Sequence, residues 1–521
     1  MKENSAIEDI YKFLRTNIKR KWIVAFLSCF CIGLLTYGYI LTHHFLTYDS
    51  LWNLYSDQDM ISSGRQFLTY VCSISSDYDL PFFNGILAIF YLSITSVFLV
   101  EIFHMKSDIT IALAAGLLVT FPSVISTFCY TFTIDGYMLA LLLATIAFWV
   151  TDRKKFGCIP GALLLSISLG IYQAYLSFLM ILCVLTLLLY LLKEENYKGI
   201  FKKIGNYAIM GVGGYVCYVL SLNGMLMWKG VSMSGYQGTD RINSFSLSQL
   251  PEGLKSAFWN FVNFARWGNV LTTTTVMKFA MLLLILGGIA LYGYLFLKQG
   301  CYKKPLKIVL TIVLASSIPF CATVISIISA DTYFHLLMRG AWSLFFIYVL
   351  VLLEESAEYK TKKEANVKRI TAMALLTCSA VLIFEFAKMA NIVGFNMEER
   401  YEKSYALSLR IVESLEKTEG YEHGMKVAIL GGFPSEEKFP STEVTKQDLS
   451  GYFGADGDYS LNSTSKFAEF MSHYLGVTIQ TISQEEEITL TQTEEFAEMQ
   501  KFPDSGCIRR IGDVWVVKLN G

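Results

Sequence analysis

The feature that most limits how this chain can fold is a series of eleven apolar runs, most of them close to 20 residues long. A helix needs roughly 20 apolar residues to cross the ~30 Å hydrocarbon core of a bilayer. Composition points the same way, because 53% of the residues are hydrophobic and only 17% are charged, whereas soluble domains carry about a quarter charged residues. We therefore expect membrane-spanning helices over residues 22–42, 84–104, 109–128, 134–151, 158–172, 173–192, 206–226, 273–297, 305–328, 334–354 and 370–393.

The distribution of Lys and Arg predicts the direction of these helices. With the N-terminus in the cytoplasm, the inner segments hold 23 Lys and Arg residues and the outer connections between helices hold five. Basic residues collect on the cytoplasmic side of membrane proteins. The pattern requires an even number of crossings in residues 158–192, which we obtain by dividing that block at Tyr172-Gln173. The C-terminal tail is then expected outside.

A change in charge marks a domain boundary near residue 393. The residues after it hold 22 acidic and 12 basic side chains, and those before it hold 22 acidic and 31 basic ones. We predict a multi-pass membrane domain, 1–393, and a small soluble extracytoplasmic domain, 394–521. Apolar periodicity in the second predicts an α/β or α+β fold, with helices at Met397–Leu415 and Ser465–Leu475, strands at Lys426–Leu430 and Val477–Ile482, and a hairpin at Cys507–Leu519. The whole chain is predicted to be an all-α polytopic bundle with this domain attached.

Cysteine and histidine patterns give no sign of a metal centre. The chain has 11 cysteines, most of them inside apolar runs, where cysteine behaves as a small hydrophobic residue. The pair His43-His44 has no evident third ligand nearby, and a metal site needs at least three. We therefore expect no cofactor; a divalent metal is compatible with the sequence but not indicated by it. No nucleic-acid partner is expected.

Charged residues within the predicted helices lie toward their outer ends. Asp49 follows the first helix, Asp135 begins the fourth, and Arg339 lies a turn or two into the tenth. Ionisable groups at membrane depth are costly and tend to be functional. An ion-coupled transporter needs a charged site near the bilayer midplane, and the predicted helices carry no clear acidic or basic residue there. The pattern favours chemistry at the outer face.

Three motifs in order and spacing resemble the type II O-antigen glucosyltransferase (Gtr II) family. Tyr48-Asp49-Ser50 followed by Ser63-Gly64-Arg65 looks like the Asp…Gly-Arg pattern of that family. The segment from Phe121 to Ala140, with Asp135 opening a helix, is similar to its second signature. Ser168-Leu-Gly-Ile-Tyr172-Gln173-Ala174 is similar to its Leu-x-x-Tyr-Gln motif. The resemblance extends over residues 20 to 390.

The resemblance implies a membrane glycosyltransferase of the GT-C type. Such an enzyme takes a sugar, here expected to be glucose, from a polyprenyl-phosphate carrier and transfers it to a cell-surface glycan outside the membrane. Membrane lipid surrounds it, and a flippase and a donor synthase are the further partners that this reaction implies. The acceptor hydroxyl must lose a proton to a carboxylate, and the departing phosphate needs a cation.

These needs assign roles to seven residues. Asp49 is the candidate base and Asp135 its rival; their ordinary explanations are a solvated loop acid and a helix N-cap. The candidate phosphate or sugar ligands are Arg65, Tyr172, Gln173, Arg241 and Arg339. The ordinary explanation of such an arginine is a side chain that faces lipid headgroups, and that of Tyr172-Gln173 is a tight turn. Two other functions stay open: a lipid-linked sugar flippase or glycan polymerase, which would need a cationic cavity deep in the bundle, and a non-enzymatic scaffold.

Overall fold

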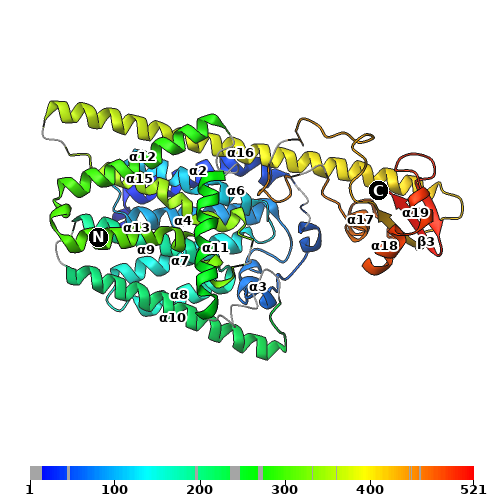
Figure 1. The fold of residues 1–521 in the computed structure, drawn as a ribbon, viewed down its shortest axis with the longest axis horizontal. Helices are drawn as coiled ribbons and strands as arrows, with labels where there is room; N and C mark the ends of the chain where they lie inside the picture. Colours follow the sequence, from blue (N-terminus) through cyan, green and yellow to red (C-terminus); the bar gives the residue numbers. More distant parts are fainter. Residues whose placement is uncertain are drawn as a thin grey trace, which may run out of the picture. The chain divides into compact units, whose positions relative to one another are not determined.

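The computed structural model is mostly helical and divides into two compact units. It describes residues 15–43, 47, 49–193, 197–234, 247–267, 274–330, 333–358, 361–444, 446, 449–456 and 459–520. One unit comprises residues up to Leu41 together with Ser56–Ala390, and the other comprises Thr42–Tyr55 together with Asn391–Gly521. We call them the membrane unit and the C-terminal unit (Figure 1).

Within these described ranges, nine helical segments are long and apolar enough to cross a membrane. They are α2 (Arg20–Thr42), α4 (Pro81–Ile102), α7 (Ile134–Arg153), α9 (Tyr175–Lys193), α10 (Tyr197–Lys229), α12 (Thr275–Lys298), α13 (Pro305–Ala322), η6 with α15 (Leu336–Trp342 and Ser343–Glu355), and α16 (Lys362–Glu416). The boundary between the two units falls within α16.

The other two predicted crossings take less regular forms. Helices α5 (Asp108–Val119) and α6 (Pro122–Phe128) form one apolar path that bends by 47°, at the point where Pro122 interrupts the hydrogen-bond pattern. Helix α8 (Cys158–Ile171) has only 14 residues, about 21 Å of rise. A non-helical break at Tyr172–Ala174 separates it from α9, as the division of that block predicts. The prediction of an all-α polytopic bundle is confirmed.

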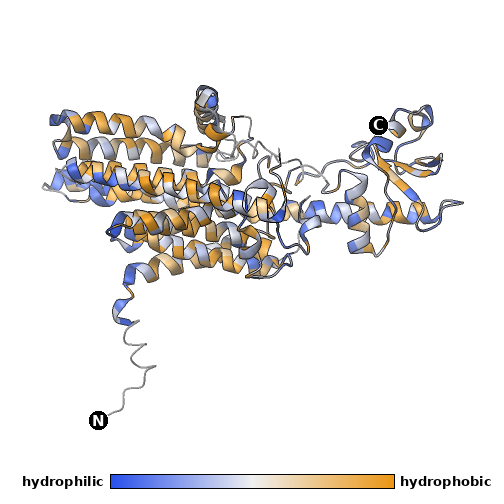
Figure 2. Cartoon of the chain, turned by 90° about the horizontal axis from the view of Figure 1, so that it is seen from below, coloured by the Kyte–Doolittle hydropathy of each residue, from blue (hydrophilic) through white to orange (hydrophobic). Residues whose placement is uncertain are grey.

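Small residues let these helices approach closely. A Cβ atom on Gly214 of α10 would lie 2.8 Å from Cδ2 of Leu165 on α8, so only glycine permits that separation. Figure 2 shows hydrophobic residues along the lengths of the bundle helices and hydrophilic residues gathered at helix ends.

Helix α11 (Leu250–Trp267) instead runs across the bundle (Figure 1) and packs on α13 and α14 (Ile325–Ile328). Short helices complete the unit: η2 (Ile61–Ser63), α3 (Leu68–Cys72), η4 (Leu247–Gln249) and η5 (Cys301–Lys303).

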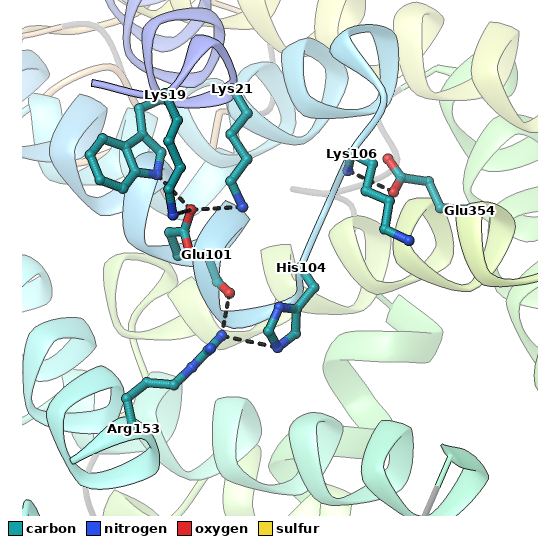
Figure 3. A network of polar contacts seen from close by, with 8 residues as sticks. Lys19, Lys21, Glu101, His104, Lys106, Arg153 and Glu354 are labelled. Carbon is teal, nitrogen blue, oxygen red and sulfur yellow. Dashed lines mark hydrogen bonds and ion pairs between the residues drawn. The ribbon is translucent and has the colours of Figure 1, made fainter. Parts of the chain in front are cut away.

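One end of the bundle holds a network of ion pairs (Figure 3). Glu101, at the end of α4, accepts from Lys21 at 2.7 Å and from the Trp22 indole at 2.6 Å. Arg153, at the end of α7, donates to the Glu101 carbonyl at 2.7 Å. Glu354, at the end of α15, accepts from the Lys106 backbone N–H at 2.9 Å. Every helix end in this network is one that the charge pattern predicts to be cytoplasmic, so we call it the basic end.

The path of α8 and α9 starts and finishes at this basic end. Asp152, near the end of α7, forms an ion pair with Lys203 near the start of α10. Lys193, which ends α9, pairs with Glu355 of α15 at 2.6 Å. The chain therefore leaves the basic end through α8 and returns through α9. Helix α7 begins at Ile134 and ends at Arg153, so its first turn lies roughly 27 Å from the basic end.

The C-terminal unit is built around a three-stranded sheet in the order β1-β3-β2. Strand β1 (Lys426–Leu430) pairs in parallel with β3 (Val514–Lys518), and β2 (Ile508–Ile511) pairs antiparallel with β3. Side chains alternate between the two faces of a strand. Val427 and Ile429 accordingly pack with Leu407 and Ile411 of α16 on one face, whereas Ala428 and Leu430 pack with Phe496 and Met499 on the other.

Short helices cover this sheet and join its strands. They are η1 (Ser50–Asn53), α17 (Thr464–Phe470), the π-helical turn η7 (Met471–Leu475), α18 (Gln484–Thr491) and α19 (Glu494–Glu498). The predicted strand at Lys426–Leu430 and the terminal hairpin are found, as is the helix near Ser465–Leu475. The segment Val477–Ile482 forms only one bridge, between Gln480 and Lys426, because a capping box at Ser483 starts α18 directly afterwards.

Candidate functional site

The break between α8 and α9 holds the Gly64-Arg65 motif in place. The side-chain amide of Gln173 donates to the backbone carbonyls of Gly64 at 2.8 Å and of Ser63 at 3.2 Å. The Phe67 N–H donates to the carbonyl of Gly170 at 2.8 Å. In a continuous helix that carbonyl would accept a backbone hydrogen bond from the next turn. The break leaves it available to the Phe67 N–H of the loop. Two of the three motifs predicted to matter are thus in direct contact.

Arg65 lies against two tyrosine rings. Its Nη1 atom donates to the Tyr137 hydroxyl at 2.9 Å, and its guanidinium lies 5.2 Å from the Tyr172 ring centroid. The two rings are stacked, with centroids 4.2 Å apart. This arrangement restricts the guanidinium to one region through cation–π attraction and a hydrogen bond. The structure therefore brings together Arg65, Tyr172 and Gln173, at the bundle end opposite the basic end. We call these three residues and Tyr137 the Arg65 group.

Asp135 lies in the first turn of α7, two residues before Tyr137. It is 2% exposed, and Ser75 hydrogen-bonds its carboxylate, whereas its Oδ1 atom has no hydrogen-bond partner. Helix α3 packs against this turn at Gly136, where a Cβ would lie 3.1 Å from the Cys72 sulfur. Asp135 therefore occupies a buried position beside the Arg65 group. A helix N-cap role does not describe it, because Thr133 occupies the cap position.

A second buried acid, Asp79, lies close enough to Asp135 for their charges to interact. Asp79 is 7% exposed and accepts from the Thr131 hydroxyl at 3.0 Å. Asn84 in turn donates to the Thr131 carbonyl at 3.2 Å. Burial and the Asp135 carboxylate raise the pKa of Asp79 to about 7, against the lowering effect of the Thr131 hydrogen bond. Sequence reasoning missed Asp79. The available signal was its position two residues before Pro81, which places an acid at the start of the membrane helix α4.

Asp49 belongs to the C-terminal unit. It precedes the short helix η1, where its backbone carbonyl accepts from the Asn53 side chain at 2.8 Å. Lys466 of α17 is 1% exposed, and its amine lies 3.3 Å from the Trp52 ring centroid. Burial raises the pKa of Asp49, and the Lys466 ammonium partly offsets that rise. The predicted base therefore has a cationic neighbour that no motif indicated.

The remaining predicted site residues lie elsewhere. Arg339 donates to the backbone carbonyls of Phe334 at 2.9 Å and Asn260 at 3.2 Å, and its guanidinium lies 4.1 Å from the Phe264 ring centroid. These contacts link the start of η6 to α11. Arg241 and His44 lie outside the described residues, and His43 is 3.8 Å from Glu398. In the part of the chain that the structure describes, no three His, Cys, Asp or Glu side chains gather as metal ligands would.

Comparison with known protein families gives one match. The family model described as Glucosyl transferase GtrII matches residues 38–353, a range that includes the Arg65 group, Asp79, Asp135 and Asp49. Neither the curated proteins nor the solved structures include one that matches this chain.

Proposed function

Because the chain belongs to the GtrII family of glucosyl transferases, we propose that it moves glucose from a polyprenyl-phosphate carrier to a cell-surface glycan on the outer side of a bacterial inner membrane. The observation that carries this proposal is the Arg65 group, in which Tyr137, Tyr172 and Gln173 restrain one guanidinium at the bundle end away from the basic end. A restrained arginine at such a position suits the phosphate of a lipid carrier.

The proposed reaction is a single displacement at the anomeric carbon. The acceptor hydroxyl oxygen attacks that carbon while its proton passes to a carboxylate. The bond between the anomeric carbon and the phosphate oxygen breaks, and its electron pair leaves with the polyprenyl phosphate. Arg65 offsets the charge that develops on this leaving group. One displacement inverts the anomeric centre.

We assign the base to Asp49 and keep Asp135 as its rival. Burial raises the pKa of Asp49, the Lys466 ammonium partly offsets that rise, and a carboxylate with a raised pKa is a better proton acceptor. Asp135 has an unpaired, buried carboxylate oxygen, which suits either proton transfer or a hydrogen bond from a sugar hydroxyl. In this assignment Tyr172 and Gln173 shape the donor site, and Arg241 and Arg339 stay candidates for substrate contact.

The proposal is tested with the purified full-length chain in lipid nanodiscs. Polyprenyl-phosphate glucose should serve as donor, and a soluble nucleotide sugar should not. Arg65→Ala should weaken apparent donor affinity by the equivalent of roughly 1.5–3 kcal/mol. Transfer from the nucleotide sugar alone would refute the proposed donor.

The two acids are separated by amide substitution. Asp49→Asn keeps shape and polarity but removes proton acceptance, so transfer should fall by about 10²–10⁴ while donor binding persists. Asp135→Asn should be milder, because an amide can still accept a hydrogen bond from a sugar. If Asp135→Asn abolishes transfer and Asp49→Asn does not, the two assignments are reversed.

A further inference from the structure

The loop that carries Arg65 is attached to α10 as well as to the break between α8 and α9. The Tyr218 hydroxyl, in the second half of α10, donates to the Gly64 carbonyl at 3.0 Å and accepts from the Gln173 amide at 3.1 Å. The Gly64 carbonyl therefore receives two donors, one from the break between α8 and α9 and one from α10. Tyr218 is 1% exposed, so water does not compete readily for these bonds.

Further bonds join the same loop to α10. Gln66 donates to the Ser221 hydroxyl at 3.0 Å, one turn beyond Tyr218. Lys229, the last residue of α10, pairs with Asp59 at 2.6 Å, and in the segment just after that helix the Ser234 N–H donates to the Ser62 carbonyl at 2.8 Å. The residues on either side of Arg65 are thus fixed at several points by α10 and the segment that follows it.

Gly64 makes the loop sensitive to these attachments. Its φ of +75° lies in the left-handed region, which glycine reaches easily and leaves easily. A glycine at the turn gives the correct shape but no rigidity, so the hydrogen bonds to its carbonyl must supply it. Arg65 follows directly, and any rotation at Gly64 would redirect its side chain.

We propose that Tyr218 is a positioning residue that, together with Gln173, locks the Gly64-Arg65 turn and so aims the Arg65 guanidinium at the phosphate of the donor. This inference rests on the proposed function for the identity of the donor. The locking of the turn is a separate, measurable property of the unliganded protein.

The cleanest test removes one atom. Tyr218→Phe keeps the buried ring and deletes only the hydroxyl, so the fold should persist. Hydrogen exchange of a peptide covering residues 60–67 should speed up several-fold, because the turn opens locally more often. The Michaelis constant for polyprenyl-phosphate glucose should rise roughly 5- to 20-fold, the usual effect of losing one hydrogen bond, and that for the acceptor should stay constant.

Two variants provide the matched comparison. Tyr215 is the neighbouring tyrosine on α10, and its ring centroid lies 6.1 Å from the ring centroid of Tyr218. Tyr215→Phe also removes one hydroxyl and should match the wild type in both measurements. Arg65→Ala combined with Tyr218→Phe should be no worse than Arg65→Ala alone, since a positioning residue has nothing left to position.

Each outcome decides something. Unchanged exchange in residues 60–67, or full additivity with Arg65→Ala, would overturn the role of Tyr218. Faster exchange in a chain whose wild type does not use polyprenyl-phosphate glucose would support the locked turn and refute the proposed donor.

Discussion

At the scale of single residues, the buried acid Asp79 should make the stability of the protein depend on pH, an effect that no sequence motif predicts. Its folded-state pKa of about 7 lies well above its ordinary value of 3.8. The unfolded chain therefore loses this proton first as pH rises, and the folded state must then ionise a buried group. The contribution of Asp79 to stability is fully present below about pH 4, falls between about pH 4 and 7, and stays low above that range.

Asp79→Asn should remove this pH dependence. Asparagine resembles the protonated acid and can still accept from Thr131, so the variant should gain stability over the wild type at about pH 8 but not at about pH 4. A shift of this size corresponds to an effect on the order of 4 kcal/mol. The measurement is the thermal midpoint of both proteins across that range. Parallel curves would show that another group carries the pH dependence, and Asp77→Asn at the partly exposed neighbouring acid is the control.

What the sequence predicts at this scale depends on whether a residue type is unusual in its surroundings. Asp135 is detectable because charges are rare in apolar segments, and Arg65 because it stands in a Gly-Arg motif of the first outer loop. Tyr218 is not, since the chain has 30 tyrosines and most positions on a membrane helix accept one. Its role depends on a loop more than 150 residues away in the chain, which helical periodicity cannot reveal.

At the scale of elements, the fourteen residues Thr42–Tyr55 show how packing can override chain order. A division at residue 393 assigns them to the membrane domain, whereas the structure groups them with the C-terminal residues. The reason is Leu51, which is 2% exposed and belongs to the same core as Leu407, Ile411 and Val427. The apolar stretch Leu51–Tyr55 is too short a signal in an outer loop for sequence reasoning to assign it to the C-terminal core.

Leu51→Ala should therefore destabilise the C-terminal unit. Leaving a cavity in a packed core costs about 2–5 kcal/mol. Limited proteolysis of the full-length protein should release fragments of residues 391–521 faster than in the wild type. Tyr55→Ala, at a side chain that is 64% exposed, should leave the cleavage rate unchanged. Equal cleavage of Leu51→Ala and wild type would mean that this segment contributes little to the core.

At the scale of the whole molecule, a sequence pattern and a structural one together predict the orientation in the membrane. The sequence places 23 basic residues in connections on one side and five in those on the other. The structure brings the ends of α4, α7, α9 and α15 together at one basic end. The ion pair between Asp152 and Lys203 places the end of α7 and the start of α10 at the same end of the bundle. Helices α8 and α9 therefore count as two crossings, even though the 14 residues of α8 barely match the bilayer thickness.

We therefore predict that the basic end faces the cytoplasm and the C-terminal unit lies outside. A protease site inserted after Lys155, between α7 and α8, should be protected in intact cells and cut in inverted membrane vesicles. A site inserted in residues 235–246, and a tag fused after Gly521, should be cut in intact cells with the outer layers opened. The comparison needs no assumption about catalysis, because it reads topology alone. If the Lys155 site and the C-terminal tag are cut from the same side, the number of crossings between them is even, and the predicted topology, with Lys155 inside and the C-terminal unit outside, fails.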